Sequence, residues 1–215
     1  MNERTRKLVD CFFAENTGLE PVRDQVLEAA HVLVRRFLEG GTLLVCGNGG
    51  SCADSDHIVG ELMKGFLLKR PLPPAERELF GSLFGPEGAA LADKLQGALP
   101  AISLCSQQAL VTAVANDGDY GLVFAQQVMG YAGPGDVVLG ISTSGNARNV
   151  KWALMAAKAR GAFAMALTGE GGGVLKSAAD LWIPVPDGRT FRIQELHGAV
   201  YHFLCAFAES EMFPE

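Results

Sequence analysis

A histidine and a glutamate four positions apart, His57 and Glu61, are the residues of this chain best suited to acid–base or metal chemistry. They lie in a segment, Ser51–Met63, that is expected to be a helix, and residues four apart share one helical face. An imidazole and a carboxylate placed side by side can exchange protons with a substrate or bind a metal ion. An ordinary polar pair on a helix surface is the alternative, and it is the more frequent meaning of such a spacing.

A second set of chemically capable side chains lies near the C-terminus, in the helix expected from about Thr190 to Met212. Gln194 and His202 are eight residues apart and therefore share a face two turns along, with His197 beside it. If the two helices pack together, they offer two imidazoles, one carboxylate and one amide oxygen, a mixture that suits zinc. Spacing does not tell whether the helices meet.

The loop Gly47–Ser51 separates an apolar, strand-like run, Thr42–Cys46, from the first of these helices. A glycine-rich turn at a helix N-terminus presents backbone N–H groups to an anion. A simple turn that needs positive φ angles is the alternative. The loop lacks the lysine of a Walker motif and the spacing of a dinucleotide fingerprint.

Three consecutive hydroxyls, Ser142-Thr143-Ser144, follow a second strand-like run and precede another helix. One hydroxyl is enough to cap a helix, so three of them favour a phosphate site. Asn116-Asp117 ends a helical run and reads as a helix stop with an Asx turn. Cys52 lies near a helix N-terminus, a position that lowers the pKa of a thiol.

Short apolar runs alternate with helical stretches, which indicates an α/β fold with a parallel sheet covered on both faces. We expect five strands, at Thr42–Cys46, Ala101–Leu104, Val137–Ile141, Phe163–Leu167 and Leu181–Pro184. Helices are expected at 3–14, Val22–Leu38, Ser51–Met63, Gln107–Ala115, Val123–Tyr131, Arg148–Arg160 and Thr190–Met212. Ligands of such sheets bind at the carboxyl ends of the strands. The loop Gly47–Ser51 and the hydroxyls Ser142–Ser144 both follow the carboxyl ends of expected strands. Thr168–Gly173 is expected to be a flexible turn.

One proline-containing segment, about 68–99, interrupts this alternation and is too short for a core of its own. We therefore expect a single domain over 1–215, with N-terminal helices in 1–40 and 68–99 as an insertion on its rim. The insertion is expected to be helical near Ala89–Leu99.

The composition excludes several classes of protein. The chain has 215 residues, 48% of them hydrophobic, and a net charge of −6, which argues against nucleic-acid binding. Its five cysteines are scattered, as in a reducing compartment. No apolar run is long enough to span a membrane. These features predict a soluble cytoplasmic protein.

Taken together, these segments resemble the sugar isomerase (SIS) domain, and within it the phosphoheptose isomerases. The specific parts are Cys46–Ser51, the pair His57 and Glu61, Asn116-Asp117, Gly135–Asn146, Leu167–Gly169, Arg192–His197 and His202. The resemblance implies a three-layer α/β/α sandwich with a mainly parallel, five-stranded, flavodoxin-like sheet, assembled as a homotetramer. It also implies interconversion of sedoheptulose 7-phosphate and D-glycero-D-manno-heptose 7-phosphate through an enediol.

The resemblance assigns roles residue by residue. Zinc ligands match His57, Glu61, Gln194 and His202, with Glu61 as the candidate base and His202 as the candidate acid. Contacts to the phosphorylated seven-carbon sugar match Asn48, Gly49, Gly50, Ser51, Glu61, Asn116, Asp117, Ser142, Thr143, Ser144 and Gln194. The chain departs from the family's pattern at Gly65, Ala147 and Phe191, and in the long insertion.

Two non-catalytic functions compete with the isomerase. One is a sugar-phosphate sensor built on the same fold, and the other is a replication-initiator-associating protein that works through protein–protein contacts. A pure binding module needs no acid–base pair, so the presence of Glu61 and His202 favours the enzyme.

Overall fold

A computed structural model of the chain describes residues 1–213. Its centre is one five-stranded sheet, ordered β2-β1-β3-β4-β5, in which every pair of neighbours is parallel. The strands are β1 (Leu43–Gly47), β2 (Ala101–Ser103), β3 (Val137–Ser142), β4 (Phe163–Gly169) and β5 (Leu181–Val185). All five expected strands are confirmed to within two residues, as is the α/β sandwich.

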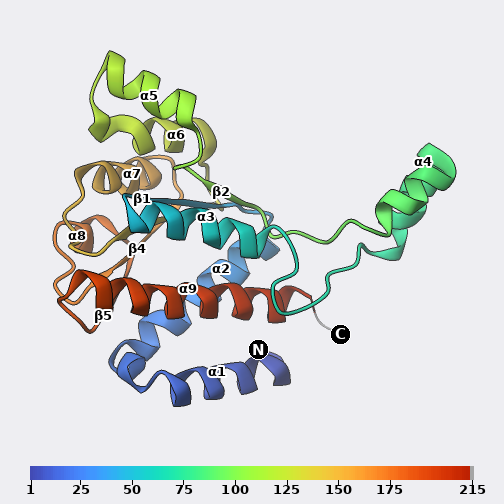
Figure 1. Ribbon diagram of the computed structural model, residues 1–215, viewed down its shortest axis with the longest axis horizontal. Coiled ribbons are helices and arrows are strands. Elements are labelled where there is room, and N and C mark those ends of the chain that lie inside the picture. The colour runs from blue at the N-terminus through green and yellow to red at the C-terminus, as the bar shows by residue number, and fades with distance from the viewer. Residues whose placement is uncertain (214–215) are drawn as a thin grey trace.

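The strands are buried on both faces, so their apolar side chains alternate between two cores. In β1, Leu43 and Val45 belong to one core, and Leu44 and Cys46 to the other. The first core lies under α1 (Glu3–Glu15), α2 (Arg23–Leu38), α3 (Gly50–Leu62) and α9 (Thr190–Met212). The second lies under α5 (Gln108–Asp117), α6 (Val123–Tyr131), α7 (Arg148–Ala159) and α8 (Leu175–Ala178). Figure 1 shows the two helical layers on opposite sides of the sheet.

The inserted segment forms an arm that extends away from the body, and not the insertion on the rim that the sequence predicts (Figure 1). Its helix α4 (Pro74–Ala92) begins with a proline at its first turn and reverses at Gly85, whose φ is +61°. A helix was expected near Ala89–Leu99, and that expectation is wrong beyond Ala92. The two prolines at the start and the glycine reversal place the helical turns earlier than the Ala/Leu composition suggested.

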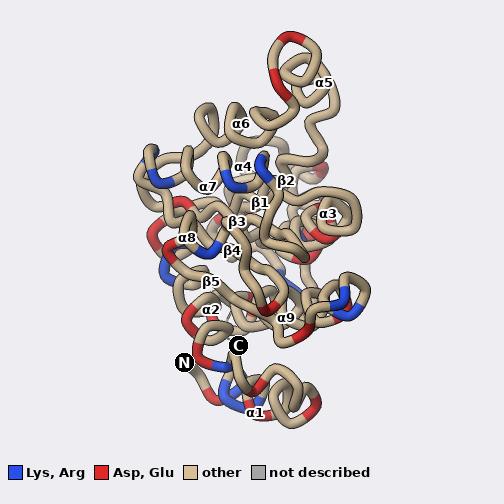
Figure 2. The backbone as a smooth tube through the Cα atoms, turned by 90° about the vertical axis from the view of Figure 1, so that its left-hand side faces the viewer, with Lys and Arg blue, Asp and Glu red and all other residues tan. Residues whose placement is uncertain are grey.

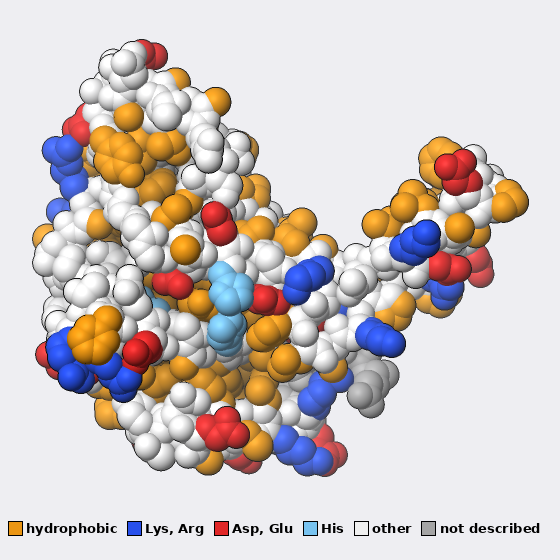
Figure 3. Space-filling model, in the orientation of Figure 1, with side chains coloured by type: hydrophobic (Ala, Val, Ile, Leu, Met, Phe, Trp, Pro, Cys, Tyr) orange, Lys and Arg blue, Asp and Glu red, His pale blue; other side chains and the backbone are white. Residues whose placement is uncertain are grey.

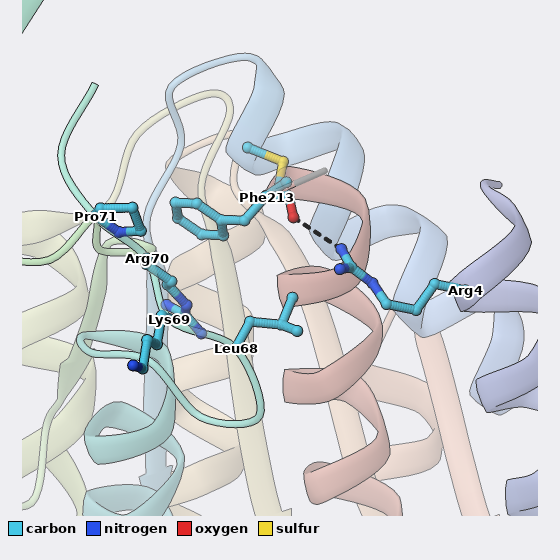
Figure 4. A pocket seen from close by; sticks show the side chains of 7 residues that line it. Arg4, Leu68, Lys69, Arg70, Pro71 and Phe213 are labelled. Atoms are coloured by element: carbon cyan, nitrogen blue, oxygen red, sulfur yellow. Dashed lines mark hydrogen bonds between the residues drawn. The ribbon is translucent and has the colours of Figure 1, made fainter. Parts of the chain in front are cut away.

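The base of the arm is held by a buried ion pair. Arg70 Nε donates to Glu209 Oε1 at 2.7 Å, and both side chains are at most 1% exposed. Glu209 also accepts the backbone N–H groups of Phe66, Leu67 and Leu68. Figure 4 shows the adjoining cavity of about 460 Å³, where Arg4 donates to the carbonyl of Phe213 at 2.8 Å.

In Figure 2, basic and acidic residues are interspersed along the backbone and do not gather in one basic region. None of the helices described in residues 1–213 is sufficiently long and apolar to cross a lipid bilayer.

Candidate active site

A cavity of about 380 Å³ opens at the carboxyl end of the sheet, between the loops that follow β1 and β3. This volume falls within the range of about 300–1,000 Å³ of small-molecule sites. The cavity is lined by Asn48, Ser51, Ile141, Ser142, Thr143, Ser144, Asn146, Ala147, Thr190 and Gln194. These lining residues carry no formal charge, so hydroxyl, amide and backbone N–H groups are the donors available to an anion.

The first loop is shaped by its glycines. Gly49 has a φ of +58° and precedes α3 without a capping side chain, which leaves the start of the helix open toward the cavity. A Cβ on Gly50 would lie 2.2 Å from Gln194 Nε2, so glycine is required for the glutamine to lie against the loop. The Asn48 side chain exchanges two 2.9 Å hydrogen bonds with the buried Asn149. Sequence reasoning missed Asn149, because its partner is 101 positions away.

The three hydroxyls of the second loop do not cap the helix that follows. Helix α7 begins after Ala147, which makes no side-chain capping bond. The backbone N–H of Asn146 donates to Ser144 Oγ at 3.2 Å. The capping explanation therefore does not account for Ser142 and Thr143, which line the cavity.

The segment after β4 supports this second loop. Gly169 N donates to Thr143 O at 3.0 Å, and Leu175 N donates to Gly145 O at 3.0 Å. A Cβ on Gly145 would lie 2.1 Å from the carbonyl oxygen of Gly172. Thr168–Gly173, for which the sequence predicts a flexible turn, thus packs its backbone directly against the hydroxyl loop.

The acid–base residues meet where α3 and α9 pack against each other. His57 Nε2 lies 3.2 Å from Glu61 Oε1 and 3.5 Å from His202 Nε2. His57 Nδ1 lies 3.2 Å from the hydroxyl of Tyr201. In Figure 3, histidine side chains reach the surface in the middle of this face, next to acidic side chains. The structure thus brings together His57, Glu61 and His202, and adds Tyr201.

The electrostatics of the trio favour an ionised carboxylate beside a neutral imidazole. Burial alone raises the pKa of Glu61, but a hydrogen bond and the positive charge of Lys64, with His57, bring this pKa below its usual value. Burial and then the neighbouring His57 lower the pKa of His202. At neutral pH, Glu61 is therefore ready to accept a proton, and His202 is an uncharged donor and acceptor.

The donor set fits zinc in type, and two separations within it, both measured from His57 Nε2, suit a shared metal ion. Four ligands at about 2.0–2.2 Å around a tetrahedral zinc ion lie about 3.3–3.6 Å from one another, close to the two separations measured at His57 Nε2. Gln194 lies about 12 Å before His202 along the helix axis, against Gly50. Within residues 1–213, no three His, Cys, Asp or Glu side chains surround one point as a closed metal site would require.

Other expected site residues lie outside this arrangement. Asn116 and Asp117 are exposed at the end of α5, where Asn116 Nδ2 donates to Asp117 Oδ1 at 2.9 Å. From that side of the molecule, Tyr120 reaches the first loop, with its hydroxyl 3.5 Å from Asn48 Oδ1. Burial and the nearby Cys105 raise the pKa of Cys52 to about 11, so the expectation of a lowered thiol pKa is wrong.

His197 is fully buried, and neither ring nitrogen has a hydrogen-bond partner among the described residues. Burial lowers the pKa of His197 to about 4, and the nearby backbone of Thr168 opposes this only in part. The folded pKa is below the unfolded value of about 6.5. The unfolded chain therefore takes up a proton first as the pH falls, and stability is lost between about pH 6.5 and pH 4.

We expect the free energy of unfolding to fall by about 2 kcal/mol between pH 7 and pH 5 through His197 alone. Urea unfolding at the two pH values measures this difference. His197→Phe should remove most of it, whereas His31→Gln, on the exposed side of α2, should leave it in place. An equal pH dependence in wild type and His197→Phe would contradict the assignment.

Comparison with known proteins agrees with this geometry. A family model described as SIS domain matches residues 107–206. A phosphoheptose isomerase of Thermodesulfovibrio yellowstonii is 36% identical over 211 residues, which cover 98% of this chain and 89% of that protein. This chain belongs to the phosphoheptose isomerase family.

Solved structures support the assignment of this isomerase. A phosphoheptose isomerase from Neisseria gonorrhoeae is 30% identical, with a TM-score of 0.69 over 96% of this chain and 92% of that one. A phosphoheptose isomerase from Francisella tularensis is 28% identical, with a TM-score of 0.75 over 92% of this chain and 91% of that one. The resemblance of the sequence to the SIS-domain isomerases is thereby confirmed. The chain is a phosphosugar isomerase, and the two non-catalytic alternatives are set aside.

Proposed function

We propose that this isomerase interconverts sedoheptulose 7-phosphate and D-glycero-D-manno-heptose 7-phosphate. The supporting observation is the distance between the cavity and the cluster of His57, Glu61 and His202. Ser51, which lines the cavity, and His57 are six residues, or about 9 Å, apart along α3. An extended chain advances about 1.2 Å per bond, so eight bonds separate phosphorus from C1 of a heptose 7-phosphate by about 10 Å. A phosphate in the cavity would thus place C1 and C2 beside His57.

The two loops hold the phosphate in this proposal, through the hydroxyls of Ser142, Thr143 and Ser144 and the open N-terminus of α3. Glu61 takes a proton from C1 of the ketose and returns it to C2, which passes through a cis-enediol. His202 carries the hydroxyl proton from O1 to O2, and its neutral imidazole can both accept and donate one. Atoms and electrons balance, because the reaction only moves two protons within the sugar.

Zinc is the proposed metal, with His57, Glu61 and His202 as ligands and Gln194 as the fourth. When bound, it would stabilise the charge that develops on the enediolate oxygens. The donor types support this proposal, and a metal analysis of the purified protein tests it.

Incubation with sedoheptulose 7-phosphate in deuterated water, followed by NMR of the sugar, tests the function. We expect an aldose product with deuterium at C2, because a base that exchanges with solvent returns the proton. Absence of conversion, together with ligand-induced shifts in the protein spectrum, would contradict the heptose proposal and point to another sugar phosphate.

Ser144→Ala tests the phosphate loop. The loss of one hydroxyl donor to an anion is expected to weaken binding of sedoheptulose 7-phosphate by about tenfold, or about 1.5 kcal/mol. Binding of unphosphorylated sedoheptulose should change little. Isothermal titration calorimetry measures both affinities, and equal losses for the two sugars would argue against a phosphate site.

We also propose a homotetramer, in which the arms of two copies pack together. The arm exposes Leu79, Leu83, Phe84 and Leu91 by 55%, 64%, 63% and 47%. Helix α4 is bent at Gly85 into two halves, so the α4 helices of two copies supply four helical segments. With an apolar face on each copy, these segments can form a four-helix bundle around a two-fold axis. Apolar patches of about 300–600 Å² on each of two copies, with their polar rims, approach the 1,200–2,000 Å² that a stable interface buries.

Light scattering during size-exclusion chromatography tests the assembly. We expect a mass of four times 22.8 kDa for the wild type, and a smaller mass for the double variant Leu83→Glu, Phe84→Glu. Leu38→Glu, at a 71% exposed position on α2, is the matched control. A wild-type monomer, or a double variant with unchanged mass, would overturn the arm contact.

A further inference from the structure

Asp54 is a partly buried acid that the roles assigned above do not use. It lies on α3 one turn before His57, and its Oδ2 atom is buried without a hydrogen-bond partner among residues 1–213. Leaving a carboxylate oxygen desolvated and unpaired costs free energy. A hydrogen-bond donor is therefore expected close to this atom.

The hydroxyl of Tyr201, on the neighbouring helix α9, is the donor available to Asp54. Tyr201 precedes His202 on α9, is only 5% exposed, and its hydroxyl oxygen lies 3.2 Å from His57 Nδ1. The hydroxyl also interacts with the carboxylate of Asp54, and a phenol keeps its proton at neutral pH. Burial raises the pKa of Asp54, and its interactions with Tyr201 and His57 oppose this rise. One hydroxyl thus lies between a carboxylate and an imidazole.

We propose that Asp54 and Tyr201 are positioning residues that hold His57 with its hydrogen on Nδ1 and its lone pair on Nε2. A phenol has one hydrogen to donate, and a carboxylate is a stronger acceptor than a neutral imidazole. The Tyr201 hydroxyl donates to Asp54, and its oxygen accepts the Nδ1–H of His57. This inference rests on the proposed role of His57 beside Glu61.

In this tautomer, the Nε2 atom of His57 carries no hydrogen and presents a lone pair. Glu61 Oε1 at 3.2 Å and His202 Nε2 at 3.5 Å both face the lone pair of His57. Two acceptors, Glu61 Oε1 and His57 Nε2, then face each other, with His202 Nε2 beside the latter, and this arrangement favours a shared proton or a metal ion between the three atoms. Hydrogen bonds to the far nitrogen of a ligating histidine fix its ring and tautomer, and loss of such a partner typically lowers metal affinity 10- to 100-fold.

Tyr201→Phe tests the proposal, because it removes the hydroxyl and keeps the ring. Nitrogen-15 NMR of the metal-free protein, assigned with His57→Gln, reports the tautomer of the neutral His57 ring. We expect Nδ1–H in the wild type and a shift toward Nε2–H in Tyr201→Phe. Zinc competition against a chelator should show a 10- to 100-fold weaker affinity. Tyr131→Phe, on the exposed side of α6, should match the wild type in both measurements.

Asp54→Asn provides a second, independent variant, with the neighbouring, exposed Asp56→Asn as its control. Its effect on the tautomer should be in the same direction, and the double variant Asp54→Asn, Tyr201→Phe should resemble Tyr201→Phe alone. A wild-type tautomer and zinc affinity in a folded Tyr201→Phe would overturn the proposal. The tautomer is read without substrate, so failure to convert a heptose phosphate would count against the proposed function and leave this test standing.

Discussion

Glu61→Gln is expected to lower kcat by at least 10²–10⁴, the contribution of a positioned general base. Glutamine keeps the size of the side chain but cannot accept a proton from carbon. Lys64 and His57 keep the pKa of Glu61 below its usual value despite burial, so the carboxylate is ionised at neutral pH and free to accept a proton. Initial rates with sedoheptulose 7-phosphate measure kcat, and thermal melting should show an intact fold.

The zinc content of this variant separates two roles of Glu61. If Glu61→Gln retains zinc and loses turnover, the carboxylate acts as a base, and if it loses both, the carboxylate is a zinc ligand. Glu195→Gln, on the exposed surface of α9, is the matched control and should keep the wild-type rate. A kcat of Glu61→Gln within threefold of the wild type would remove Glu61 from the mechanism.

Arg70→Met is expected to lower the free energy of unfolding by about 3–5 kcal/mol, the cost of leaving a buried charge without its partner. The change removes the 2.7 Å bond to Glu209 and a 2.7 Å bond from Nη1 to the carbonyl of Leu62. It also removes the bond from Nη2 to the carbonyl of Glu61, so we expect the end of α3 to loosen. Urea unfolding measures the loss.

Arg77→Met is the control for this prediction, because Arg77 pairs with Asp93 on the exposed surface of the arm. Exposed ion pairs contribute about 0–1 kcal/mol. Similar losses for the two variants would show that the buried pair with Glu209 does not hold the base of the arm.

The sequence predicted the sheet well, because strand and helix limits in this chain depend on local features. β1 is a buried apolar run between the glycines at 40–41 and at 47, and β3 lies between Gly135 and a hydroxyl loop. The helices Val123–Tyr131 and Thr190–Met212 have the expected ends. The arm was predicted less well, because the reversal at Gly85 depends on contacts such as that between Gly88 and the backbone of Phe80.

The sequence by itself determined which chemical groups are present and which local elements carry them: His57 and Glu61 on one helical face, three hydroxyls after a strand, and the family motifs. Only the tertiary structure decided which groups meet. Contact of His57 with Tyr201 and His202 joins residues more than 140 positions apart, and the bond between Asn48 and Asn149 spans 101. Such contacts depend on how whole helical faces pack across the sheet, and local periodicity carries no information about that packing.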